Sequence, residues 1–149
     1  MTVGQYEQLK LENQFCFPLY AASRLVTRMY QPLLDDLDIT YPQYLILLVL
    51  WEQEESGVME LGEKLMLASN TLTPLLKRME SKGIVSRVRS GADERKVRIS
   101  LTDKGKEMEK LACQIPEALA SKAGNRFPLD RILKMRDELN AFLNEFKDT

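Results

Sequence analysis

The order of apolar and polar residues changes its period at Gly83, and the change separates two neighbouring elements. Residues 69–82 carry one apolar stripe at the spacing of an α-helix, formed by Leu72, Leu75, Leu76 and Met79. Residues 85–89 and 96–101 instead alternate as strands do, and the residues between them have the composition of a turn. The pattern therefore predicts a helix followed directly by a two-stranded hairpin, which is the arrangement of a winged helix-turn-helix.

The polar face of this predicted helix carries the side chains that commonly contact DNA. Short hydroxyls and amides come first and long cations follow: Asn70, Thr71, Thr73, Lys77, Arg78 and Lys82. Residues 69–98 hold eight Lys or Arg against three acids, a net charge of +5, whereas the whole chain carries −1. Positive charge gathered in one segment of a near-neutral chain favours a surface that contacts phosphates.

Two helices are predicted before this region. A long one covers residues 9 to about 37, and Pro18 and Pro32 are expected to kink or break it. The next, over about 42–53, begins close to a cap at Thr40 or the following residue. It is apolar nearly all round, so it is expected to be the buried central helix.

Further helices are predicted on both sides of the hairpin. A short one covers 58–65, and Ser69 is the expected N-cap of the helix after it. Beyond the hairpin, one helix is expected over about 102–120 and a last one over 129–146. The fold class is therefore mostly α with a small β wing.

The chain is expected to form a single domain over 1–149, with the winged-helix DNA-binding lobe at 42–101. The segments 1–37 and 102–149 carry more apolar surface than one winged helix can cover, so they are assigned as dimerisation helices. A homodimer would present two recognition helices to the half-sites of a pseudo-palindromic operator, about 34 Å apart.

Composition excludes several other classes. No apolar run approaches the length of a membrane span, and no secretory signal peptide is predicted, so the protein is expected to be cytoplasmic. Cys16 and Cys113 are the two cysteines, too few and too far apart for a zinc cluster or a disulfide framework. The chain has no histidine, which removes most metal sites and histidine-based catalysis. We expect no cofactor, no metal and no enzymatic activity.

Several segments together resemble the MarR family of regulators, and more narrowly its organic-hydroperoxide-responsive, OhrR-like branch. General family marks are the Leu-Thr-Pro-Leu-Leu of the recognition helix and the Asp-Glu-Arg of the wing. The surroundings of Cys16 and the run Thr-Tyr-Pro-Gln-Tyr are specific to the branch. The segments that carry the match, in register from about Leu11 to Glu107, are 11–17, 38–45, 61–65, 71–77, 93–95 and 99–102.

The resemblance implies a role in DNA binding for a defined set of residues. Those expected at the major groove or its flanking phosphates are Ser69, Thr71, Thr73, Lys77 and Arg78. Arg87 and Arg89 would meet the DNA backbone, and Arg95 would enter the minor groove, oriented by Asp93. A narrow minor groove concentrates negative potential and so favours an inserted arginine. The alternative for Asp93 and Arg95 is an ordinary surface ion pair in a turn.

The resemblance also implies that Cys16 is the peroxide-reactive residue. On composition alone, a lone cysteine among apolar neighbours is more often an inert buried side chain. In OhrR-like proteins, tyrosines at the positions of Tyr30 and Tyr41 bring hydroxyls to it from the partner subunit, and Tyr20 is a further candidate. Phenol donors stabilise a thiolate over a thiol. Oxidation of Cys16 to a sulfenic acid would then release the operator. The alternative interpretation of Tyr30 and Tyr41 is purely structural, as half-buried rings of the core.

Cys113 is a second candidate redox residue. Some relatives carry a resolving cysteine that forms a disulfide between subunits, but matching Ile115-Pro116-Glu117 to those relatives places that position near Ser121. Either Cys113 pairs with Cys16 in an unusual geometry, or it is a bystander and a low-molecular-weight thiol resolves the sulfenic acid. We favour the interpretation that Cys113 takes no part in the redox reaction.

Three other functions are considered. A MarR-type regulator could be released by a small aromatic ligand at the dimer crevice, with Trp51 or phenylalanines lining the pocket. A thiol peroxidase could use Cys16 catalytically, although no Arg or His is placed to assist. A purely architectural DNA-binding protein would sense nothing. Operator, regulated genes and the sign of regulation are not encoded in these patterns.

Overall fold

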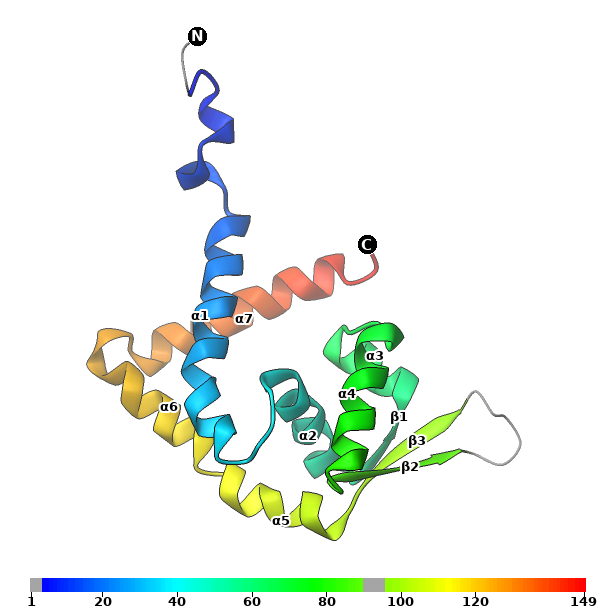
Figure 1. The fold of residues 1–149 in the computed structure, drawn as a ribbon. Helices are drawn as coiled ribbons and strands as arrows, with labels where there is room; N and C mark the ends of the chain where they lie inside the picture. Colours follow the sequence, from blue (N-terminus) through cyan, green and yellow to red (C-terminus); the bar gives the residue numbers. More distant parts are fainter. Residues whose placement is uncertain (1–3, 90–95) are drawn as a thin grey trace. The chain divides into compact units, whose positions relative to one another are not determined.

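The computed structural model describes residues 4–89 and 96–149, and it divides into two compact units, Met1–Cys113 and Gln114–Thr149 (Figure 1). Most of the described chain is helical, with one small antiparallel sheet in the first unit. The predicted fold class is confirmed.

The first long helix begins later than the sequence pattern predicts. Two single 3-10 turns, Glu7–Leu9 and Leu11–Asn13, precede α1, which spans Cys16–Asp35. Pro18 lies in the first turn of α1, where no intrahelical N–H is needed, so it does not interrupt the helix. Pro32 lies inside α1 without ending it. The prediction of a helix from residue 9 was therefore wrong, and neither proline breaks the helix; a kink at either proline stays a prediction.

The central helix α2 spans Tyr41–Gln53 and is the best-buried helix of the first unit. Its start at Thr40 is confirmed by a capping box, in which the Thr40 backbone N–H donates to Gln43 Oε1 at 3.0 Å. Its buried side chains include Ile46, Leu47 and Leu50, all 0% exposed. Most of the other helices and strands of this unit contact this apolar helix.

The helix-turn-helix consists of α3, Val58–Leu65, and α4, Ser69–Ser81. The N-cap of α4 is Ala68, which has extended backbone angles, and Ser69 is already the first helical residue. The prediction of Ser69 as the cap was wrong by one position. Pro74 consequently lies deeper than the first turn, so the carbonyl of Asn70 has no N–H to accept from within the helix.

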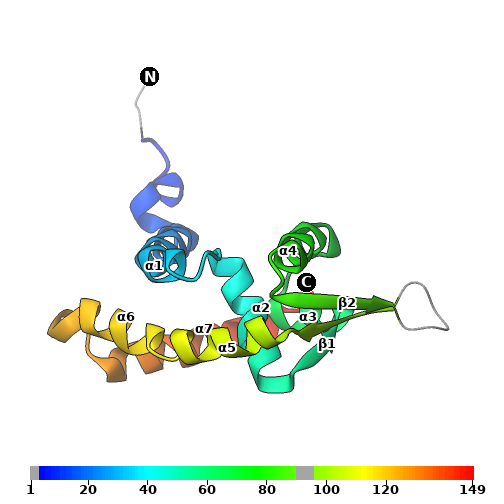
Figure 2. The same cartoon turned by 60° about the horizontal axis from the view of Figure 1, so that its bottom comes forward.

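A three-stranded antiparallel sheet forms the wing and its base, with the strand order β1-β3-β2. Strands β2, Val85–Arg89, and β3, Val97–Leu101, form the predicted hairpin, and α4 lies alongside β2 in both views (Figures 1 and 2). Strand β1, Glu55–Gly57, pairs with β3 and was not predicted. Three residues are too short to show an alternating pattern.

The segment after the wing contains a break that the sequence analysis missed. Helix α5 spans Asp103–Ala112 and is capped by the Thr102 hydroxyl, which accepts from the Gly105 N–H at 3.1 Å. A separate helix α6 spans Ile115–Ala123. The single helix predicted over 102–120 was wrong because Pro116 has no N–H to donate to the carbonyl of Ala112.

In the second unit, α6 is followed by a 3-10 turn, Gly124–Arg126, and by α7, Leu129–Phe146, whose bounds match the prediction. Apolar side chains of α7 are exposed, including Met135, Leu139 and Phe146. Among the described residues, no helix combines the length and the apolar character required to span a bilayer.

Candidate DNA-binding surface and redox centre

Helix α4 separates its apolar and polar residues as predicted. Leu72, Leu75, Leu76 and Met79 are buried, whereas the polar residues are exposed except for the half-buried Thr73: Ser69, Asn70, Thr71, Lys77 and Arg78. The buried stripe fixes the helix to the unit, because these side chains pack against α2, α3 and β2. The opposite, polar face of the helix is exposed.

The inner face of the wing carries two of the expected phosphate contacts. Arg87 pairs with the buried Ile99 and Arg89 pairs with Val97, so both arginines follow Val85 on the face that packs on the helices. Arg89 is exposed, whereas the Nε atom of Arg87 is buried and has no hydrogen-bond partner among residues 4–89 and 96–149. Asp93 and Arg95 lie outside the described residues.

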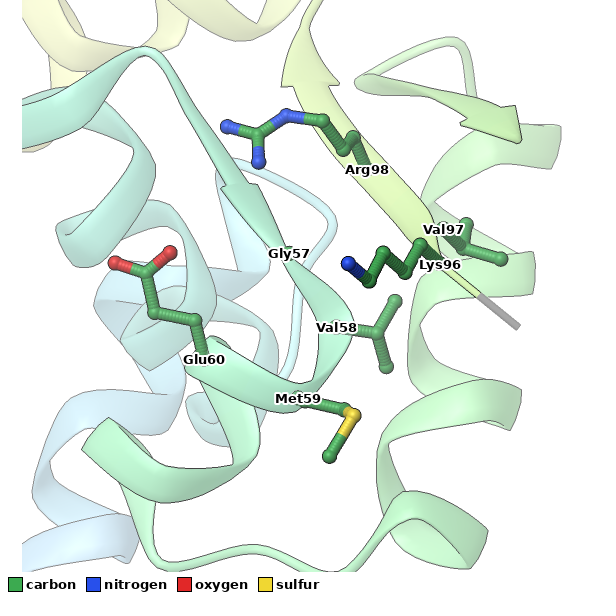
Figure 3. Close-up of a pocket in the computed structure, with 7 residues that line it drawn as sticks. All are labelled: Gly57, Val58, Met59, Glu60, Lys96, Val97 and Arg98. Atoms are coloured by element: carbon green, nitrogen blue, oxygen red, sulfur yellow. The ribbon is translucent and has the colours of Figure 1, made fainter. Parts of the chain in front are cut away.

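The other face of the wing carries further cations. Figure 3 shows Lys96 and Arg98 extending on the side of Glu60, beside a cavity of about 340 Å³ that opens next to Val58. Arg98 Nη2 lies 2.9 Å from Glu55 Oε1 on the neighbouring strand. Positive charge therefore lies on both faces of the wing, but that of Arg98 is partly neutralised.

Lys82 differs from the other cations of the predicted DNA-facing stripe. Its Nζ donates to the backbone carbonyl of Asp38 at 2.5 Å and lies 3.3 Å from the Asp38 carboxylate. This cation therefore links the end of the recognition helix to the connection between α1 and α2.

Cys16 is the first residue of α1 and is exposed. Phe17 and Leu19 beside it are also exposed, so the thiol lies within an apolar patch. Tyr20 lies one turn further along α1 on the same side, since residues four apart are neighbours on a helix. Its ring is covered by the Arg24 guanidinium, 5.3 Å from the ring centroid.

Tyr30 and Tyr41 lie together, with ring centroids 5.1 Å apart. A third tyrosine, Tyr44, joins them at 5.7 Å from Tyr30 and 6.3 Å from Tyr41. Burial raises the pKa of all three phenols, and the proximity of Tyr41 raises the pKa of Tyr30 further. The hydroxyls therefore stay protonated at neutral pH and can act as hydrogen-bond donors.

A single chain does not bring Cys16 to these tyrosines. Fourteen residues of continuous helix separate Cys16 from Tyr30, which corresponds to about 21 Å along the axis. That distance exceeds the combined reach of the two side chains. The predicted redox residues therefore form two separate groups in one chain: Cys16 with Tyr20, and Tyr30 with Tyr41.

Cys113 is the C-cap of α5 and is exposed, with its Sγ donating to the Lys110 carbonyl at 3.1 Å. Both cysteines are free thiols. The described residues contain no cluster of metal-ligating side chains.

Sequence reasoning did not single out Tyr44 or Asp38. Tyr44 follows Tyr41 by three positions on α2, a spacing that could have placed both rings on one helix face. Its ring also meets Trp51 edge-on at 6.2 Å, and the Trp51 indole N–H donates to the Gly105 carbonyl at 2.9 Å. No local pattern indicates the contact of Asp38 with Lys82, since it joins residues 44 positions apart.

Comparison with known proteins agrees with this geometry. Residues 28–111 match the family model of the transcriptional regulator SarA/Rot. Over 113 residues, the chain is 56% identical to the organic hydroperoxide resistance transcriptional regulator of Bacillus subtilis, covering 76% of this chain and 77% of the relative. The chain belongs to the MarR family, in its organic-hydroperoxide-responsive branch.

Comparison with solved structures extends the similarity to nearly the whole of this chain. Reduced AbfR bound to DNA is 39% identical, with a TM-score of 0.77, and the match covers 95% of this chain and 97% of that one. AbfR, a Staphylococcus epidermidis protein, has also been solved in an overoxidised form bound to DNA and in a disulfide form. This chain is accordingly a DNA-binding transcriptional regulator of the winged-helix type.

Proposed function

We propose that this regulator senses organic hydroperoxides through Cys16 and releases its operator when that residue is oxidised. The observation that carries the proposal is the placement of the exposed thiol in an apolar patch on α1, together with a separate pair of protonated phenols, Tyr30 and Tyr41. An apolar surround favours organic hydroperoxides over hydrogen peroxide. The oxidised and reduced forms of the related AbfR support a redox-regulated DNA binder.

The proposed chemistry is a two-electron oxidation of sulfur. The Cys16 thiolate attacks the distal oxygen of the hydroperoxide, the O–O bond breaks, and the alkoxide leaves as an alcohol after taking up a proton. Cys16 becomes a sulfenic acid. Phenol hydroxyls stabilise the attacking thiolate by donating hydrogen bonds to it.

We infer that the phenols come from a second subunit. Cys16 and Tyr30 lie at opposite ends of α1, so an antiparallel pair of α1 helices would bring the thiol of one chain to the tyrosines of the other. The exposed apolar residues of α1 and α7, among them Leu25, Val26 and Leu139, are the surfaces proposed for dimerisation. Oxidation would then alter contacts between the subunits and change the spacing of the two recognition helices.

For DNA binding, we propose the exposed residues of α4 at the major groove and Arg87 and Arg89 at the backbone. Asp93 and Arg95 are proposed for the minor groove from the resemblance alone. A low-molecular-weight thiol is proposed to resolve the sulfenic acid, with Cys113 as a bystander.

The test is fluorescence anisotropy of the protein on a labelled duplex taken from upstream of its own gene. tert-Butyl hydroperoxide is added first and a reducing thiol second, with wild type and Cys16→Ser side by side. Release of the wild type alone, reversed by thiol, supports the proposal. Release of both proteins by peroxide, or of neither, contradicts it.

A further inference from the structure

The contact between Asp38 and Lys82 joins the segment that carries Tyr41 to the end of the recognition helix. Lys82 is the C-cap of α4, and Asp38 lies three residues before Tyr41, in the connection from α1 to α2. Lys82 Nζ donates to the Asp38 carbonyl at 2.5 Å and lies 3.3 Å from its carboxylate. One ammonium thus holds both oxygen groups of the same residue.

The backbone of Asp38 is held in a conformation that glycine usually occupies. Its φ is 55°, in the left-handed region. The Asp38 N–H bonds to the Asp35 carbonyl at 3.0 Å and the Ile39 N–H to the Leu34 carbonyl at 3.3 Å, so Asp38 closes the C-terminus of α1. Glycine fits this position without strain, yet here the residue carries a carboxylate that reaches Lys82.

The Lys82 end of the contact is also held by several hydrogen bonds and close contacts. Gly83, with φ 73°, ends α4 in the same type of closure, and the Lys104 ammonium donates to the Lys82 carbonyl at 2.7 Å. Thr102 Oγ1 lies 2.9 Å from the Ile84 carbonyl oxygen. A Cβ on Gly105 would lie 2.3 Å from that same oxygen, so α5 approaches this connection too closely for any other residue. Lys82 therefore projects from a rigid end of the recognition helix.

An exposed ion pair of this kind contributes little to folding stability. The contact can instead affect the position of α4, because it ties Lys82 to the connection between α1 and Tyr41. We propose that Lys82 is a positioning residue that couples the tyrosine-bearing segment to the recognition helix. The contact holds the end of α4 in the DNA-binding position, and displacement of Tyr41 on oxidation moves Asp38 and, through Lys82, α4. The coupling to oxidation rests on the proposed function.

The competing role for Lys82 is a direct contact to a DNA phosphate. The two roles differ in their salt dependence, because loss of one phosphate contact lowers the slope of log affinity against log salt by about 0.9 per subunit. A positioning role lowers affinity without lowering that slope. Asp38 separates the roles further: removing an acid near DNA should raise affinity if only charge matters.

The experiment measures operator affinity of the full-length protein at several salt concentrations, before and after tert-butyl hydroperoxide. The variants are Lys82→Met, Lys82→Arg, Asp38→Asn and the double variant Asp38→Asn/Lys82→Met. Asn keeps the tolerance for the left-handed backbone while removing the charge. Lys77→Met serves as the reference for a phosphate contact, and Lys64→Met, on α3, as the control for loss of a surface cation.

We expect Lys82→Met to weaken binding by the reduced protein about 2- to 5-fold, with an unchanged salt slope and a smaller ratio of reduced to oxidised affinity. Asp38→Asn should weaken binding in the same direction, the double variant should add little to Lys82→Met, and Lys82→Arg should restore the ratio. A reduced slope with an unchanged ratio would make Lys82 a phosphate contact and overturn the proposal, as would tighter binding by Asp38→Asn. If the wild type ignores peroxide, the proposed function fails, and the double-variant comparison on reduced protein still decides whether the contact positions α4.

Discussion

The DNA-binding lobe and the redox centre are built in opposite ways. Helix α4 has its buried stripe and its exposed polar face in place within one chain, supported by α2, α3 and the sheet. The proposed redox residues are divided between Cys16 at the start of α1 and the Tyr30–Tyr41 pair, and Cys16 and Tyr30 are about 21 Å apart along the helix. Under the proposed function, a single chain therefore holds a whole recognition helix but only part of the redox centre, and the signal would act through the relation between two subunits.

The largest effect is expected from truncating the core of the DNA-binding lobe. Leu76 is 1% exposed, so Leu76→Ala should lower the free energy of unfolding by about 2–5 kcal/mol. Leu19 on α1 is 37% exposed. The Leu19→Ala variant should change the free energy of unfolding by less than about 0.5 kcal/mol, but it should weaken self-association. Denaturant unfolding and sedimentation measure the two effects. Equal losses of unfolding free energy in both variants would contradict the claim that Leu76 belongs to a core within one chain and Leu19 does not.

Removing a cation from the proposed DNA-facing surface should leave the proposed sensing reaction intact. Lys77→Met should weaken DNA binding by reduced and oxidised protein alike, and lower the salt slope by about 0.9 per subunit. Formation of the Cys16 sulfenic acid, trapped with a dimedone reagent and followed by mass spectrometry, should keep its wild-type rate. A slower oxidation would mean that the two regions are not separable in this way.

Trp51 on α2 contacts Tyr44, which neighbours the Tyr30–Tyr41 pair, and its indole N–H donates to the carbonyl of Gly105 on α5. Trp51→Phe keeps a ring beside Tyr44 but removes the N–H donor, so unfolding should become easier by about 1 kcal/mol. Thermal unfolding measures the loss, and Trp51→Leu, which removes the ring as well, should lose more. Wild-type stability in Trp51→Phe would show that the bond does not matter.

A smaller effect should appear in alkaline solution. The folded chain raises the pKa of Tyr30, Tyr41 and Tyr44 above the ordinary value of 10.0. The unfolded chain therefore loses these protons first, and stability falls as the pH rises through and above 10. Tyr30→Phe should make that fall shallower, as measured by denaturant unfolding at pH 8 and at pH 10.5. If the pH dependence of stability were unchanged in Tyr30→Phe, Tyr30 would not contribute to it.

The sequence predicted the parts of the fold that depend on local patterns. The stripe of α4, the hairpin strands, the cap at Thr40 and the bounds of α7 all follow from periodicity and capping. The short strand β1 and the break before Pro116 were missed, because the first depends on pairing with β3 and the second on a single absent N–H.

Site residues divide along the same line. The exposed face of α4 could be read from its 3.6-residue period. In contrast, the contacts of Lys82 with Asp38 and of Trp51 with Gly105 join residues 44 and 54 positions apart, and only the folded chain brings them together. The assignment of Cys16, Tyr30 and Tyr41 came from family resemblance, and one chain by itself cannot assemble them.

The most direct test of sensing between subunits is complementation in mixed dimers. Cys16→Ser chains are mixed with chains carrying both Tyr30→Phe and Tyr41→Phe, and the rate of sulfenic acid formation with tert-butyl hydroperoxide is measured. If each thiol uses the tyrosines of the other chain, the mixed dimer regains one intact site and reacts faster than either parent, at about half the wild-type yield per dimer. If the mixture reacts no faster than its parents, the redox centre does not form between subunits.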